Sequence, residues 1–289
     1  MRQETVPVRA WDVSCAGPHP RLLPGVHGYR GFRLHLIGPR RRLETPDGLV
    51  TLLLTFAGGL RISPAGPEGG GARRFGSLLA GLHTEARVGE HDGDLYGIEI
   101  LLKPWMAFTL FGISMHELAE TITEPSEVLG PRAELLTGAL QDLPGWQDRF
   151  ALLDLVLTEW AAAGPACSPQ VAWAWDMLTS THGLTPIGRL AAGAGWGRRQ
   201  LESRFREQIG LTPKAASRVL RLQRAVRMLT QQGRPSDVAA ACGFSDQAHF
   251  SREFKTMTSL TSRHFLKSRT TGTTWDRVDG APTSVLLAV

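Results

Sequence analysis

One pattern occurs twice between residues 186 and 267. Ala191 and Gly195 in the first copy correspond to Ala239 and Gly243 in the second, 48 residues later in both cases. Each copy has a short helix pattern containing alanine, then a glycine, then a second helix pattern carrying arginine. Glycine adopts a left-handed backbone angle at little cost, and a small residue four positions earlier lets the second helix cross closely over the first. The repeat therefore predicts two helix-turn-helix units.

Positive charge is concentrated in the same part of the chain. The protein carries a net charge of +5, but residues 171–270 hold 16 Lys and Arg against 6 Asp and Glu. The remaining residues hold 16 against 21. A basic segment beside an acidic one predicts that only one domain meets a polyanion. Coinciding with the repeat, it predicts double-stranded DNA as the partner, because the second helix of such a unit enters the major groove.

The length of 289 residues favours two domains over one. We expect an α+β protein whose N-terminal domain is a small β-barrel or sandwich with helices. Its predicted strands lie at 29–36, 49–56 and 97–102, and its predicted helices at 132–143 and 146–163, while residues 1–27 show little periodicity. The expected boundaries are residues 1–164 for the N-terminal domain, 165–170 for the linker, 171–269 for an all-α domain, and 270–289 for a flexible tail.

Seven helices are predicted for the C-terminal domain. Thr212 can cap the longest one and Pro213 suits its first turn. This long helix would join the two helix-turn-helix units. The predicted helices are residues 171–181, 186–193, 197–208, 213–231, 235–241, 246–257 and 262–268.

The second helix of each unit divides into an inward and an outward face. Leu201 with Phe205, and Phe250 with Phe254, are four residues apart and should face inward. On the outward face, Arg can bind guanine, Gln adenine, Glu the cytosine amino group, and Ala the thymine methyl group. The candidate base contacts are Arg198, Arg199, Glu202, Ser203, Gln247, Ala248, His249 and Arg252. The candidate phosphate contacts are Lys214, Arg218, Arg221, Lys255 and Arg263.

Each of these candidates has a simpler interpretation as well. An exposed arginine on a helix is usually solvated, and Arg198 can equally hold a phosphate. Glu202 can pair with Arg198 or Arg206 along its own helix. His249 can pack against its neighbours or bind backbone instead of a base.

Two segments resemble the DNA-binding domain of AraC/XylS-type transcription regulators. They are Arg-Leu-Gln-Arg-Ala at 221–225 and Ala-Cys-Gly-Phe-Ser-Asp-Gln-Ala-His-Phe-Ser-Arg-Glu-Phe-Lys at 241–255, and Ile-Gly-Leu-Thr-Pro at 209–213 is similar too. The resemblance implies seven helices, with two reading helices that enter successive major grooves about one helical turn apart. Carried over by position, it implies base contacts from Arg199, Glu202, Ser203, Gln247, Ala248 and Arg252.

The chain departs from the family pattern after the second unit. Ser259 and Ser262 stand where the family usually has Gly and Pro. Serine lacks the backbone freedom of glycine and the fixed φ angle of proline. We therefore expect the last helix to begin differently. Ser203 also replaces a longer side chain, which weakens the expected direct readout by the first unit.

The N-terminal region more faintly resembles the variable effector or dimerisation domains of such regulators. The resemblance implies a small-molecule effector, a homodimer through this domain, and RNA polymerase as a partner of an activator. In helix 146–163 the apolar residues Phe150, Leu153, Leu157 and Trp160 recur at helical spacing. Packing against the same domain explains this stripe as well, but a large apolar face on the last helix before the linker favours self-association.

Histidines and carboxylates in the N-terminal region offer three interpretations. His27, His35, His83 and His91 with nearby acids can bind a metal, satisfy local hydrogen bonds, or line a polar ligand pocket. No compact ligand spacing is present, so we expect no metal, no cofactor and no catalytic residue. Cys15, Cys167 and Cys242 show neither zinc-ligand nor disulfide spacing, and we expect small buried hydrophobes.

The function predicted from these patterns is a sequence-specific transcription regulator. No run of 18 apolar residues and no secretion signal are seen, so a cytoplasmic protein with no membrane contact is expected. A DNA-repair enzyme with a similar module is a second class, but it would need a cluster of reactive cysteines. An architectural DNA-binding protein without sequence preference is a third.

Overall fold

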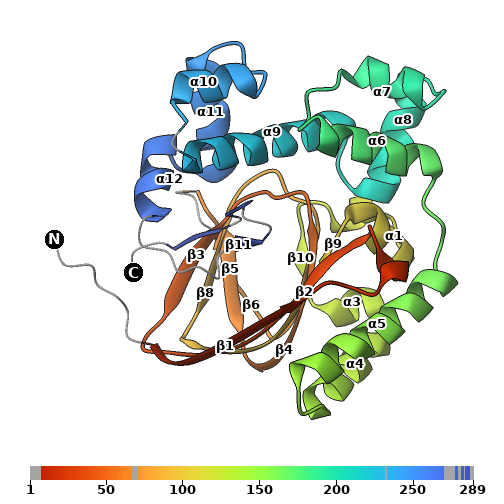
Figure 1. The fold of residues 1–289 in the computed structure, drawn as a ribbon, viewed down its shortest axis with the longest axis vertical. Coiled ribbons are helices and arrows are strands. Elements are labelled where there is room, and N and C mark those ends of the chain that lie inside the picture. The colour runs from red at the N-terminus through yellow and green to blue at the C-terminus, as the bar shows by residue number, and fades with distance from the viewer. Residues whose placement is uncertain are drawn as a thin grey trace.

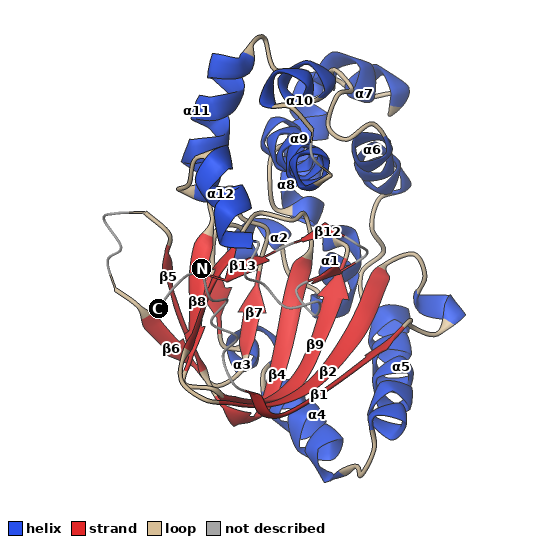
Figure 2. Cartoon of the chain, turned by 60° about the vertical axis from the view of Figure 1, so that its left-hand side comes forward, coloured by secondary structure: helices blue, strands red, loops and turns tan. Residues whose placement is uncertain are grey.

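The chain folds into two parts that lie against each other (Figure 1). The computed structural model describes residues 8–66, 71–231, 233–269, 277–278, 281–282 and 284–286. Antiparallel sheets with helices on one side form the N-terminal part, and helices alone form most of the C-terminal part (Figure 2). The predicted α+β class is confirmed.

Within the described residues, the N-terminal part contains a six-stranded and a five-stranded sheet. They form an open sandwich, one of the two arrangements predicted, rather than a closed barrel. The six-stranded sheet has the order β1 (Val8–Ala16), β2 (Val26–Leu36), β9 (Asp94–Leu102), β4 (Val50–Gly58), β7 (Leu78–Ala80) and β10 (Ile122–Thr123). The five-stranded sheet has the order β13 (Ser284–Leu286), β3 (Arg40–Glu44), β8 (Arg87–His91), β5 (Leu60–Pro64) and β6 (Arg73–Phe75).

Strand β9 is the centre of the larger sheet because β2 and β4 pair with its two edges. Ile100 lies opposite Tyr29 on one side and opposite Leu52 on the other, and all three side chains are buried. The predicted strands at 29–36 and 97–102 fall inside β2 and β9, and the one at 49–56 begins one residue before β4. Strand β1 was not predicted: its residues show little alternation, and they form a strand by pairing along β2 from Ala10 opposite His35 to Ala16 opposite Tyr29.

Helix α5 (Trp146–Ala163) carries the apolar stripe that suggested self-association. Phe150, Leu153 and Leu157 are buried within the same chain, and Phe150 stacks on Tyr29 with ring centroids 5.9 Å apart. Packing inside the N-terminal part therefore accounts for the stripe. The other elements here are a short 3-10 turn (Pro20–Leu22), α1 (Pro104–Phe111), α2 (Met115–Leu118), α3 (Pro125–Leu129) and α4 (Pro131–Asp142).

The described part of the C-terminal region contains the seven predicted helices, each within two residues of its expected bounds. Thr212 caps the longest helix by accepting a hydrogen bond from the Ala215 N–H at 3.1 Å. This helix, α9, crosses above the sheets and connects α8 at one end to α10 at the other (Figure 1). The helices are α6 (Pro169–Ser180), α7 (Ile187–Gly193), α8 (Arg198–Ile209), α9 (Pro213–Thr230), α10 (Pro235–Ala241), α11 (Gln247–Thr258) and α12 (Ser262–Arg269).

The two parts share one buried apolar cluster. Met115 and Leu118 of α2 belong to the same cluster as Phe205 and Ile209 of α8. The C-terminal segment also returns to the sheets: β13 pairs with β3, and β11 (Arg277–Val278) pairs with β12 (Ala281–Pro282). We expected a flexible tail at 270–289; three short strands occupy part of it, and its other positions lie outside the described residues.

Two further sequence expectations can be compared with the described residues. Cys242 is buried and Cys167 is half-buried, but Cys15 is exposed on β1, so the expectation of buried cysteines is wrong for Cys15. All three are free thiols. In the described part of the chain, no helix has both the length and the apolar character needed to cross a membrane.

Gly31 of β2 makes room for the Trp146 ring, and this contact provides a test of the packing. A Cβ on Gly31 would lie 2.2 Å from Trp146 Cε3. The ring cannot easily move, because its Nε1 donates to Asp12 at 2.7 Å and its face stacks on Phe150. We expect Gly31→Ala to lower the free energy of unfolding by about 1–3 kcal/mol, the usual cost of overpacking.

The measurement is urea denaturation followed by circular dichroism. Gly28→Ala in the same strand is the matched control, because a Cβ there meets only the Ala16 carbonyl oxygen at an ordinary 3.5 Å. Equal midpoints for the two variants would contradict the packing described for Trp146.

Candidate DNA interface

The two helix-turn-helix units repeat each other in backbone geometry. Gly195 and Gly243 have φ angles of 69° and 70°, the left-handed region expected from the sequence. In the first turn the Trp196 N–H donates to the Ala191 carbonyl at 2.9 Å, and in the second the Phe244 N–H donates to the Ala239 carbonyl at 3.0 Å. The repeated sequence pattern therefore corresponds to a repeated turn.

The inward faces of both second helices are buried as predicted. Leu201 and Phe205 of α8, and Phe250 and Phe254 of α11, are almost completely inaccessible to solvent. Phe250 and Phe254 contact each other edge to face at 5.6 Å. These four side chains fix the rotation of each helix, and so determine which of its residues face outward.

The first reading helix, α8, exposes all four of its predicted base contacts: Arg198, Arg199, Glu202 and Ser203. The Arg198 side chain lies back over α7, where its Nη2 is 2.8 Å from the position of a Cβ on Gly188. Arg199, Glu202 and Ser203 instead line a shallow hollow of about 450 Å³, whose other wall includes Ser114 and His116 beside α2. The outward face of α8 is thus bordered by the N-terminal part.

The second reading helix, α11, exposes Gln247, Ala248 and Arg252 near its N-terminal end. Asp246 caps this end by accepting a hydrogen bond from the His249 N–H at 2.7 Å, and this bond lowers the pKa of the Asp246 carboxyl group. The His249 ring is half-buried. It lies 3.1 Å from the Ser245 hydroxyl and edge-on to the Phe244 ring. His249 thus packs against its neighbours, which is the alternative to base contact given for it above.

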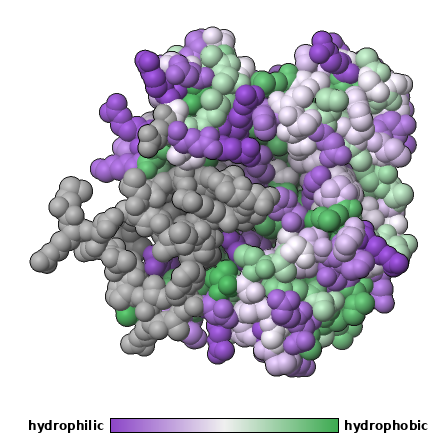
Figure 3. Space-filling view, in the orientation of Figure 1, coloured by the Kyte–Doolittle hydropathy of each residue, from purple (hydrophilic) through white to green (hydrophobic). Residues whose placement is uncertain are grey.

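The five candidate phosphate contacts fall into two groups. Lys214, Lys255 and Arg263 are exposed. Arg218 instead donates to Glu253 at 2.9 Å and so joins α9 to α11. Arg221 donates to the Gly243 carbonyl at 3.2 Å and lies over the Phe244 ring, so that it supports the second turn. Hydrophilic side chains are frequent over α9 and α10 in the upper left of the molecule (Figure 3).

Both reading helices are fixed at their C-terminal ends. In α8, Gln208 accepts from the Ser168 N–H of the linker at 2.9 Å, and Arg206 donates to His116 Nε2 at 2.7 Å. In α11, the Met257 carbonyl accepts from the Ala86 N–H just before β8, also at 2.7 Å. These contacts join residues far apart in the chain, so no sequence pattern predicted them.

Comparison with known proteins finds similarity to helix-turn-helix regulators in the C-terminal region. A family model described as "Helix-turn-helix domain" matches residues 190–268. An uncharacterized HTH-type transcriptional regulator of Bacillus subtilis, YbfI, is 28% identical over 137 residues, which are 47% of this chain and 46% of the relative. The HTH-type transcriptional regulator MtrA of Neisseria gonorrhoeae is 36% identical over 70 residues, 24% of this chain and 23% of the relative. The match thus spans less than half the length of either relative.

One solved structure is also similar to part of the chain. It is a transcriptional regulator with an AraC-type DNA-binding domain from Chromobacterium violaceum, 28% identical, covering 35% of this chain and 91% of that chain with a TM-score of 0.33. The C-terminal region is an AraC-type helix-turn-helix domain. The match to the family model at residues 190–268 confirms the family resemblance drawn from residues 209–255.

The histidines of the N-terminal part are held by local contacts or buried. His35 lies 2.7 Å from Asp94, and His91 Nδ1 accepts from the Gly93 N–H at 3.3 Å. Burial lowers the pKa of both His83 and His91 to about 4, so these two are neutral at pH 7. Among the described side chains, no group of three or more His, Cys, Asp or Glu could hold a metal ion.

An enclosed cavity of about 150 Å³ lies between the two sheets, and its charged groups are largely matched. Arg30 pairs with Glu99 at 2.6 Å, and Arg42 lies 3.6 Å from Glu44. Asp47 is buried beside them, and this burial raises the pKa of its carboxyl group to about 7. The rest of the lining is mainly apolar, with Leu53, Leu78 and Leu101 among its residues, and the charged groups of the cavity lie close to opposite charges.

Ser259, at the C-terminal end of α11, provides a test of the departure from the family pattern. Its φ angle is 59°, so the serine adopts the left-handed conformation that glycine would take at this position. Helix α12 nevertheless begins at Ser262, where it was predicted, and Thr261 accepts a hydrogen bond from the His264 N–H at 3.3 Å. We expect Ser259→Gly to raise the free energy of unfolding of the AraC-type domain by up to about 1 kcal/mol.

The measurement is thermal and urea denaturation of the full chain. Ser262→Gly is the matched control: it lies in the first turn of a helix, where glycine gains nothing from a left-handed angle, and it should be neutral or destabilising. A destabilising effect of Ser259→Gly equal to that of the control would show that the left-handed angle imposes no strain.

Proposed function

We propose that this protein is a sequence-specific DNA-binding transcription regulator whose N-terminal domain controls its AraC-type domain. One observation carries the proposal: the N-terminal halves of α8 and α11 are exposed and carry arginine, glutamine and glutamate, whereas their C-terminal ends are packed. The exposed end is the end that contacts base edges in helix-turn-helix docking. We assign residues 1–164 to the controlling domain, 165–170 to the linker, 171–269 to the DNA-binding domain and 270–289 to a C-terminal extension.

The base contacts in this proposal come from both reading helices. Arg199, Glu202 and Ser203 act in the first helix, and Gln247, Ala248 and Arg252 in the second. Arg198, which lies back over α7, and Lys214, Lys255 and Arg263 contact phosphates. Arg218 and Arg221 are engaged inside the domain, so their phosphate contact requires a hydrogen bond in addition to those they already make.

The wider regulatory roles belong to the same proposal. A small-molecule effector would act through the N-terminal domain, which contains the enclosed cavity and a more open outer pocket next to it. A homodimer through this domain, contact with RNA polymerase and activation of transcription complete the proposed role, in the cytoplasm. No catalytic residue takes part.

The experiment that tests the function is binding to DNA selected from random sequence. The selected site and a scrambled version are compared by fluorescence anisotropy over a series of salt concentrations. A sequence-specific regulator keeps a gap of roughly 4–10 kcal/mol between the two. An architectural protein would bind both with the same affinity at each salt concentration, and that result would reject the proposal.

Substitution of the reading arginines tests the assignment of bases. Arg199→Ala and Arg252→Ala should each cost about 1–3 kcal/mol on the selected site and relax the preference at one base position, because each removes a bidentate contact. Lys214→Ala should weaken binding to all sequences alike and reduce the salt slope. Binding is measured by anisotropy on a set of single-base variants of the site.

Arg204→Ala is the matched control. Arg204 is an exposed arginine of the same helix, but it pairs with Glu207 at 3.0 Å on another side of α8. Its loss should leave the base preference unchanged. If Arg199→Ala and Arg204→Ala gave the same uniform loss on every variant, base contact by Arg199 would be wrong.

A further inference from the structure

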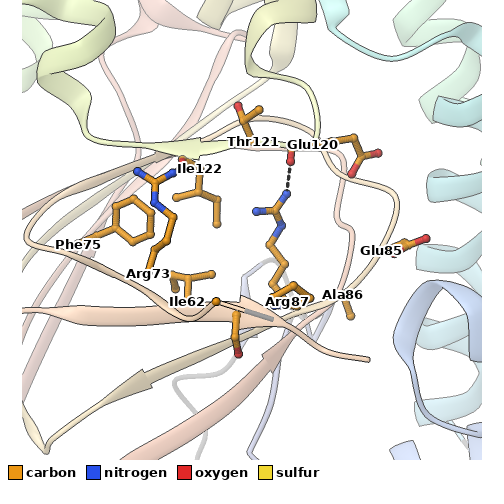
Figure 4. Close-up of a pocket in the computed structure, with 12 residues that line it drawn as sticks. Ile62, Arg73, Phe75, Glu85, Ala86, Arg87, Glu120, Thr121 and Ile122 are labelled. Atoms are coloured by element: carbon orange, nitrogen blue, oxygen red, sulfur yellow. Dashed lines mark hydrogen bonds between the residues drawn. The ribbon is translucent and has the colours of Figure 1, made fainter. Parts of the chain in front are cut away.

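A second, more open pocket lies at the edge of the sandwich, between β5 and β6 of the smaller sheet and residues 120–122 at the edge of the larger sheet, next to the enclosed cavity. Its volume is about 470 Å³, within the range of small-ligand pockets. Ile62, Phe75 and Ile122 give it apolar walls, and Arg73 and Arg87 lie on its two sides (Figure 4). Apolar walls between two cations suit a molecule with an apolar body and a negative charge.

The two guanidinium groups bind only neutral partners. Arg73 Nη1 donates to the Ile122 carbonyl at 3.3 Å, and Arg87 Nη2 donates to the Glu120 carbonyl. Among the described residues, neither forms an ion pair with a carboxylate. The Glu120 carboxylate instead accepts from Thr84 Oγ1 at 2.7 Å, and it acts on Arg87 only at longer range.

The lining also includes Glu85 and Glu120, so acidic and basic residues are equal in number here, but among the described side chains neither glutamate pairs directly with the two arginines. The Arg87 side chain is half-buried, and loss of solvent lowers the pKa of its guanidinium group. In the enclosed cavity, by contrast, Arg30 already has a carboxylate at 2.6 Å. An added anion would therefore gain more beside Arg73 and Arg87 than inside the sandwich.

The same pocket is connected to both reading helices. Ala86, on its rim, donates its N–H to the Met257 carbonyl at the end of α11. Glu120, on the opposite rim, directly follows the α2 region, and His116 of α2 binds Arg206 of α8. The contact behind α2 is tight, because a Cβ on Gly81 would lie 1.9 Å from the Leu118 carbonyl oxygen.

We propose that this pocket binds a small organic carboxylate with an apolar body, held between Arg73 and Arg87. A carboxylate is a stronger acceptor for guanidinium than a peptide carbonyl, so the bound molecule draws both arginines away from the Ile122 and Glu120 carbonyls. Residues 120–122 are then released from β6 and β8, and the position of α2 against α8 changes. The binding step stands by itself, whereas the effect on DNA rests on the proposed function.

The binding step is tested by isothermal titration calorimetry on the full chain. The probes are sodium benzoate and sodium 4-phenylbutyrate, with benzamide as a neutral analogue and inorganic phosphate as an anion without an apolar body. We expect at least one of the two carboxylates to bind. Arg73→Gln and Arg87→Gln should each weaken its binding about tenfold or more, since a hydrogen bond to a charged group is lost.

Arg74→Gln is the matched control, because Arg74 is the next residue of the same strand and lies near Asp92 at 3.8 Å instead. It should bind the probe as the unchanged protein does. Circular dichroism verifies the fold of each variant, and Arg73, which is exposed, keeps the test decisive should Arg87→Gln not fold.

Three results would overturn the site. They are no binding of either carboxylate up to about 10 mM, equal binding of benzamide or of phosphate, and unchanged affinity in Arg73→Gln. The link to DNA is then measured by anisotropy on the selected site with and without the saturating probe. A change in affinity of about fivefold or more, lost in Arg73→Gln, supports the link, and an unchanged affinity rejects it. If the protein showed no preferred DNA site, the proposed function would be rejected, but the calorimetric evidence for the pocket would stand.

Discussion

The regulatory arrangement depends on one constraint: both reading helices are fixed at the end that does not meet DNA. The Met257 carbonyl in α11 accepts from the Ala86 backbone, and Gly210 after α8 lies so close to the Met115 carbonyl that a Cβ would come within 2.8 Å of it. A helix moves as a rigid body over this length, so a small displacement at the fixed end also shifts its exposed end. In the proposed function, the N-terminal part would therefore alter DNA contact by shifting the reading helices.

Helix α9 complements this constraint by setting the separation of the two units. Its 18 residues extend about 27 Å, on the order of one turn of the DNA helix. The units lie at its two ends (Figure 1), and the ion pair between Arg218 and Glu253 joins the second unit to its side. Because α9 is a single continuous helix, it keeps the separation of the two units constant.

The sequence predicted what local chemistry determines. The helices of the AraC-type domain were found because Gly195, Gly243 and Thr212 mark their ends by backbone angle and capping, which depend on a few neighbouring residues. Strand β1 was missed because it depends on pairing with β2, and the sequence alone carried no alternation. Arg218 was predicted to contact phosphate, but a carboxylate 35 positions away is its partner in the fold. Contacts of this kind need the three-dimensional arrangement.

The beginning of β8 shows why the coupling of the two parts escapes sequence analysis altogether. Arg87 lines both the enclosed cavity and the outer pocket, and the preceding residue binds α11. That bond is made by a backbone N–H, which every residue except proline possesses. The identity of Ala86 therefore contains no information about it. The connection between the outer pocket and α11 is determined by the paths of two backbones, whereas side-chain chemistry determines only what the proposed ligand site and the reading helix would each recognise.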